Sequence, residues 1–187
     1  MPETGPGKIY LFNEFFGVGD AVALTADSNN LGDFYVGGEG IEDADAGVAA
    51  NAALLGGVIT ITSANVDKDT TFIGTAGEGL DVGLMGPIVM ETRIQMPDLD
   101  TKQLFFGLTS LCTLDQALED TCDGNTTTIT LSAGSLCGFL LADTLTDDED
   151  WHGVYNGGTT TGETVSTSID LDDDARTVLF DQESGTR

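Results

Sequence analysis

The sequence predicts an all-β protein, an antiparallel β-sandwich preceded by an irregular N-terminal arm. Short runs of β-branched and aromatic residues are separated by turns, in a chain of 187 residues that contains 25 glycines. We expect roughly ten short strands, as in antiparallel sandwiches. One run, residues 88–96, alternates apolar and polar side chains with a period of two, as a half-buried strand does.

Residues 1–40 are rich in glycine and form the expected irregular arm, with one short strand at 9–12. Residues 41–187 form the expected sandwich. Within it, residues 42–53 are the best helix candidate, although Gly47 weakens that interpretation and leaves a loop as the alternative.

The other expected strands follow one another with turns between them, and Pro97 ends the alternating run. Residues 111–125 are expected to be irregular. The last expected strand has no partner after it, so we expect either that the domain continues beyond Arg187, which we favour, or that this strand lies at a sheet edge. The expected strands are 58–62, 70–75, 80–84, 88–96, 103–109, 127–131, 137–142, 151–155, 163–169 and 176–181.

The charge is strongly negative, with 32 acidic residues against 6 lysines and arginines and a formal net charge of -26. Such a chain is repelled by nucleic acid and by anionic membranes, and we expect neither as a partner. Hydrophobic residues make up 40% of the chain, which is enough for a folded core. The start carries no secretory signal and no run is long enough to span a membrane, so synthesis in a cytoplasm is expected.

The three cysteines are Cys112, Cys122 and Cys137. Their odd number argues against a disulfide framework, although a bridge between Cys112 and Cys122 stays open under oxidising conditions. A zinc site is disfavoured because the chain has no Cys-x-x-Cys pair and a single histidine, His152.

The residues that could act in catalysis do not occur at the spacings that known catalytic sites require, so we expect that the protein is not an enzyme. No glutamate is followed by an aspartate two positions on, as the paired carboxylates of related glycosidases require. A serine nucleophile would have to use His152, beside Trp151, and no Gly-x-Ser-x-Gly turn is present. The glycines at 37–40 lack the lysine of a phosphate-binding loop.

Two sets of residues are candidates for binding. Aromatic side chains on the glycine-rich arm favour docking onto a partner protein, with core packing as an even alternative; they are Tyr10, Phe12, Phe15 and Phe16. Oxygen-bearing side chains in acidic loops leave a structural calcium site open, and no other cofactor is expected. The first candidate ligands are Asp120, Asp123 and Asn125, and a second set is Asp147, Asp148 and Asp150.

The segments 91–95 (ETRIQ) and 100–109 (DTKQLFFGLT) resemble the central strand pair of structural proteins from tailed bacteriophages, marine ones especially. Residues 138–141, 163–165 and 176–178 fit the strands that follow. The resemblance covers roughly residues 57–187, and it implies a concanavalin-A-like jelly roll.

The same resemblance implies a capsid decoration or head-fibre protein, made in the host cytoplasm and placed on the capsid exterior. The implied partners are the major capsid protein and sister subunits, with a trimer as the expected homo-oligomer. The alternative is a carbohydrate-binding module on a phage fibre or a secreted protein. An exposed Trp151 on a concave sheet would favour that alternative, and a buried Trp151 would count against it.

Overall fold

The computed structural model describes residues 29–31, 34–50, 57–75, 80, 88–96, 100–111, 113–157 and 160–170. The chain divides into two compact units, Met1–Ala76 with Thr113–Gln116, and Gly77–Cys112 with Ala117–Arg187. Every ladder between the described strands is antiparallel, and the described residues contain no α-helix. The predicted all-β antiparallel class is therefore confirmed.

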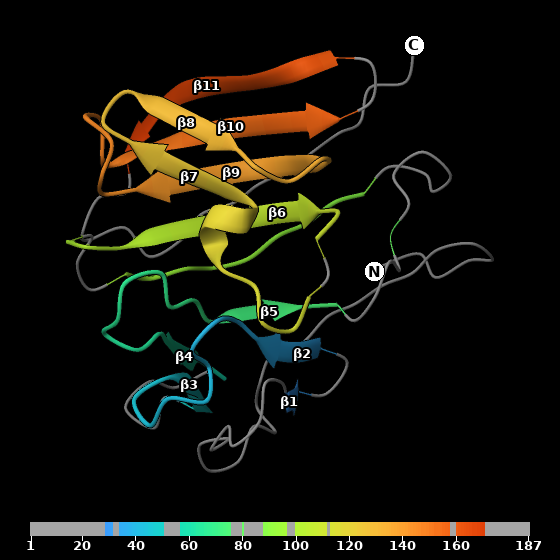
Figure 1. Cartoon of the computed structure of the whole chain (residues 1–187), viewed down its shortest axis with the longest axis vertical. Helices are drawn as coiled ribbons and strands as arrows, with labels where there is room; N and C mark the ends of the chain where they lie inside the picture. The colour runs from blue at the N-terminus through green and yellow to red at the C-terminus, as the bar shows by residue number, and fades with distance from the viewer. Residues whose placement is uncertain are drawn as a thin grey trace. The chain divides into compact units, whose positions relative to one another are not determined.

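Unit 1 contains a three-stranded sheet and a two-stranded hairpin (Figure 1). The sheet has the order β1 (Asn29–Leu31), β2 (Phe34–Gly37) and β5 (Phe72–Gly74), and the hairpin pairs β3 (Gly47–Ala50) with β4 (Ile59–Thr62). An edge-to-face contact joins the rings of Tyr35 and Phe72, whose centroids lie 5.5 Å apart. The core of the unit consists of Leu31, Val36, Ile41 and Val48.

Two expectations for this unit are wrong. Strands β1 and β2 lie inside the segment expected to be an irregular arm. The helix candidate at 42–53 forms no helix in its described residues. Turns occupy 39–45, in agreement with the loop alternative, and β3 begins at Gly47. Pairing of Val48 with Ile61 and burial of Val48 outweigh the helix propensity of the alanines around them.

Unit 2 is built on a four-stranded sheet with the order β11 (Thr160–Asp170), β10 (Asp150–Gly157), β9 (Leu136–Ala142) and β6 (Gln103–Thr109). These four strands were predicted, and β6 has the predicted bounds. A short 3-10 helix, η1 (Leu118–Asp120), leads into a hairpin of β7 (Cys122–Asn125) and β8 (Thr128–Leu131). Helix η1 and β7 fall in the stretch expected to be irregular, residues 111–125, which is a third correction.

Both faces of the four-stranded sheet are covered by apolar side chains. Neighbouring residues Leu140 and Leu141 are buried on opposite faces, as strand geometry requires. The β7–β8 hairpin crosses one face in Figure 1 and contributes Cys122, Ile129 and Leu131 to the cluster around Leu140. On the other face, Leu141 and Trp151 pack with Ile94, Met96, Leu104 and Phe139.

Residues 88–96 follow the predicted alternation without forming a ladder. Exposed and half-buried side chains alternate along the whole segment, with Ile94 and Met96 turned to the sheet. The described residues show no strand assignment there. The predicted alternation of buried and exposed side chains is thus confirmed, whereas the prediction that the segment pairs as a β-strand is wrong.

Other expected strands, at 9–12 and 176–181, and nearly all of the one at 80–84, lie outside the described residues. Among the residues that the structure describes, no helix is long and apolar enough to cross a membrane.

Candidate functional site

The aromatic residues predicted to dock onto a partner, Tyr10, Phe12, Phe15 and Phe16, lie outside the described residues. The predicted cation ligands, Asp120, Asp123 and Asn125, are described. Asp120 lies in η1, and Asp123 and Asn125 lie in β7. Each of the three has an oxygen that accepts a hydrogen bond from the protein itself.

These hydrogen bonds give the three residues structural roles. Asp120 Oδ2 accepts from the Ala117 amide at 3.3 Å, just before η1. Asn125 Oδ1 accepts from the hydroxyl of Thr126 at 3.0 Å. Within the described part of the chain, no three His, Cys, Asp or Glu side chains come together as a metal site.

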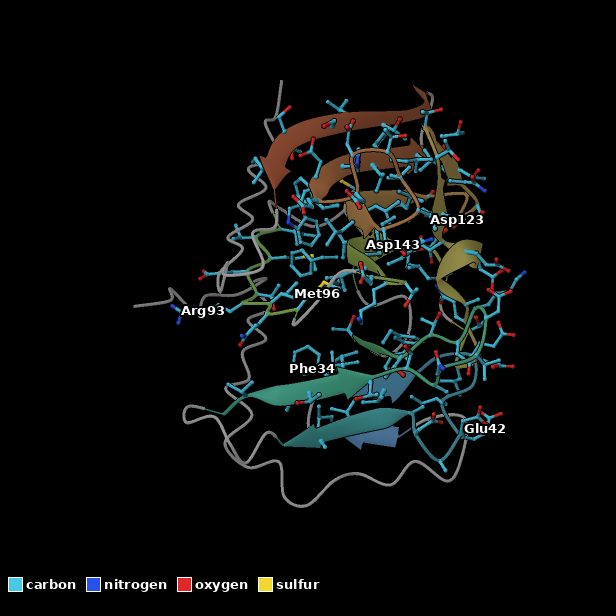
Figure 2. The ribbon with its side chains drawn as sticks, turned by 90° about the vertical axis from the view of Figure 1, so that its left-hand side faces the viewer. Phe34, Glu42, Arg93, Met96, Asp123 and Asp143 are labelled. Carbon is cyan, nitrogen blue, oxygen red and sulfur yellow. The ribbon has the colours of Figure 1, made fainter. Side chains whose placement is uncertain are left out.

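Asp123 belongs to a polar network around Gln103, a residue that sequence reasoning missed. The Gln103 Nε2 group donates to Asp123 Oδ1 at 3.0 Å, and its Oε1 accepts from the Gly124 amide at 3.4 Å. Thr144 accepts from the same Nε2 group at 3.3 Å and donates to the Gly124 carbonyl. The network joins the start of β6 to β7, near the Asp123 and Asp143 labels in Figure 2.

Trp151 and His152, the residues on which sugar binding or catalysis would depend, lie inside the protein. Trp151 is only 1% exposed and packs against Leu141. His152 is also buried, and its Nε2 lies 3.3 Å from the carbonyl oxygen of Asp147. An indole in this position cannot stack on a sugar ring, and the imidazole is held by its own preceding turn.

Cys122 is a free, buried thiol in the core between the sheet and the β7–β8 hairpin. Burial, with a smaller contribution from the carboxylate of Asp123, raises the pKa of the thiol to about 12. The reactive thiolate is therefore suppressed at neutral pH, so Cys122 is not suited to nucleophilic chemistry. Its possible bridge partner, Cys112, lies outside the described residues.

An acidic group in unit 1 surrounds Asp69. Its Oδ2 atom is shielded from solvent and has no hydrogen-bond partner among the described residues. A side chain at Gly40 would place its Cβ 2.4 Å from the carboxyl carbon of Asp69. Burial first, and then the carboxylates of Asp43, Glu42 and Asp45, raise the pKa of Asp69. Nothing in the local sequence distinguished Asp69 from Asp67 beside it.

We expect Asp69→Asn to stabilise unit 1 at pH 7, which should appear as stronger protection of its backbone amides from hydrogen exchange. A carboxyl whose pKa is raised by folding binds its proton more tightly in the folded state. The wild-type unit therefore gains stability as pH falls through the raised pKa towards the ordinary range, and the variant should lose that pH dependence. Amide hydrogen exchange in β2 and β3 measures the effect, with the exposed Asp67→Asn as the charge-matched control. Equal protection in the two variants at pH 7 would contradict the role of Asp69.

No family model, curated protein or solved structure matches this chain. What the described residues offer is a set of apolar cores, polar groups held by structural hydrogen bonds, and exposed acidic turns.

Proposed function

We propose that this protein is a non-enzymatic structural subunit displayed on the outside of a phage capsid, which it decorates or cements through protein–protein interfaces. One observation carries the proposal: in the part of the chain that the structure describes, the tryptophan, the histidine and the cysteine of the β7–β8 hairpin are buried, whereas carboxylates fill exposed turns. Trp151, His152 and Cys122 are all buried, and the turn residues Asp147, Asp148 and Glu149 are all exposed.

The proposed fold of unit 2 is a jelly roll. Its described part supports this through a four-stranded antiparallel sheet, with the β7–β8 hairpin over one face and residues 88–96 over the other. The segments that resemble phage structural proteins, 91–95 and 100–109, supply the covering segment and β6. A jelly roll has two sheets packed face to face, and we propose that further strands of unit 2 complete the second sheet.

The proposed mechanism is burial of apolar surface at an interface. The aromatic arm, with Tyr10, Phe12, Phe15 and Phe16, would dock onto the major capsid protein. Binding only to the assembled shell would favour the assembled particle by mass action. Sister subunits would associate as a trimer around a local three-fold axis, and the acidic surface would face the medium.

The alternative of a carbohydrate-binding module loses its main support with the burial of Trp151. A sugar-binding groove needs an exposed aromatic platform beside polar groups, and the single tryptophan of the chain is not available for one.

The proposal predicts saturable binding to capsids from which the protein has been stripped. Purified protein is mixed with these particles, the particles are pelleted, and bound copies are counted. We expect saturation at a number commensurate with icosahedral symmetry. A variant lacking residues 1–20 should keep the β-sheet circular dichroism of the wild type and lose particle binding. Absence of wild-type binding would overturn the decoration role, and unchanged binding of the deletion variant would overturn the role of the arm.

A further inference from the structure

Residues 88–96 form an extended segment with one anchored and one open face. Ile94 and Met96 pack against the cluster of Leu141 and Trp151, so the backbone that carries the outer side chains has a fixed support. Figure 2 shows Met96 and Arg93 on opposite sides of this segment, with Arg93 directed away from the sheet. The outward stripe consists of Val89, Glu91, Arg93 and Gln95, all exposed.

Two members of the outward stripe are suited to an interface. Val89 is 64% exposed, the highest value among the exposed large hydrophobic residues that the structure describes. Arg93 makes no hydrogen bond or ion pair to any described residue. Among the other described cations, the Lys102 ammonium donates to the Asp100 carbonyl oxygen at 3.4 Å. An exposed aliphatic side chain and an arginine without a partner among the described residues, on one extended stripe, are suited to an interface hot spot.

The charge of the chain restricts what can bind there. At a formal net charge of -26, two copies repel each other at long range, so a cation at the contact favours self-association. Arg93 is an exposed cation on the outward stripe and can serve that purpose. A second copy also offers the complementary group: the turn between β9 and β10 exposes three consecutive carboxylates, Asp147, Asp148 and Glu149. The guanidinium group binds carboxylates in a bidentate manner.

We propose that the outward stripe of residues 88–96 is the self-association surface of this protein, and that Arg93 binds the acidic turn 147–149 of a second copy. Val89 is covered in the same contact. Both elements belong to unit 2, so the contact requires only that unit's own structure. This inference rests on the proposed function, in which sister subunits associate on the capsid. It adds the surface through which they associate.

Sedimentation equilibrium of the purified full chain over a range of concentrations tests this surface. We expect the wild type to self-associate, and Arg93→Gln and Val89→Ser each to weaken association by about tenfold or more. Neutralising the turn with Asp148→Asn and Glu149→Gln together should weaken it in the same way. Lys68→Gln, which changes net charge by the same amount as Arg93→Gln, and Val165→Ser, at an apolar residue that is 61% exposed on β11, are the matched controls and should associate like the wild type.

A wild type that stays monomeric at every concentration would overturn the inference. So would equal weakening by Arg93→Gln and Lys68→Gln, which would indicate a general charge effect. Capsid pelleting separates this result from the proposed function: a monomer that saturates capsids leaves the decoration role intact. Arg93-dependent association without capsid binding supports the surface and overturns the decoration role.

Discussion

Replacing Gly138 with alanine is expected to lower the free energy of unfolding of unit 2 by about 3 kcal/mol, the upper range for overpacking a closely packed site. Gly138 of β9 pairs with Gly107 of β6. A Cβ at position 138 would lie 2.4 Å from the Phe106 carbonyl oxygen and 2.8 Å from the Gly107 Cα. Both neighbours are backbone atoms, so only separation of the two strands can relieve the overlap.

The ring of Phe105 explains why both positions need glycine. Its Cζ atom lies 2.8 Å from the place of a Cβ at Gly107, and its Cε2 atom lies 2.9 Å from the place of one at Gly138. The ring therefore covers the two glycines and fills the space that side chains would take, as aromatic residues do over glycines in sheets. Adding a methyl group displaces both the ladder and the ring, and the ring belongs to the core around Leu140.

Gly134→Ala is the matched control, because no atom lies within 4 Å of a Cβ at that position. Urea unfolding followed by the emission of Trp151, the single tryptophan of the chain, reports on unit 2 alone. The alanine at position 134 should leave the midpoint near that of the wild type. Equal midpoints for the two variants would show that the β6–β9 pairing tolerates the extra carbon.

Local patterns predicted the elements whose burial follows the sequence directly. The alternation of 88–96 gave the correct faces, and the apolar run at 103–109 gave β6 with the observed bounds. Strand β7 was missed because its sequence, Cys-Asp-Gly-Asn, reads as a turn, and its strand character comes from pairing with β8. The local sequence could not predict that residues 88–96 form no ladder, because pairing depends on which strand lies beside the segment.

The candidate site residues show the same limit. Asp120, Asp123 and Asn125 were predicted as cation ligands from their chemistry alone, and in the structure each accepts a hydrogen bond from the protein. Gln103 and Asp69 carried no local signal, because their roles come from partners that are distant in sequence. Gln103 contacts Asp123 across a separation of 20 residues. Asp69 is affected by the turn that contains Asp43.

The second large effect is expected for Trp151→Ala, which should reduce the free energy of unfolding of unit 2 by about 3–5 kcal/mol. Trp151 is buried in one cluster with Leu141, and Ile94 and Met96 pack against this cluster. Its removal takes away the largest side chain of that cluster and leaves a cavity under the 88–96 segment. Tyr155→Ala, at a residue 40% exposed on the same strand, is the control and should cost far less. Urea unfolding followed by far-UV circular dichroism measures both, and similar losses would contradict the burial of the indole.

The same residue connects stability with function. If Trp151 is a core residue, wild-type emission should be blue-shifted, iodide should quench it weakly, and sugars should leave it unchanged. If the indole instead formed a sugar platform, iodide would quench it strongly, saccharides would shift its emission, and Trp151→Ala would fold normally.

The packing of Trp151 also supports the 88–96 segment, so Trp151→Ala should weaken self-association through Arg93, whereas Tyr155→Ala should not. The tryptophan then contributes to function by holding the outward stripe in place, and not by contacting a ligand.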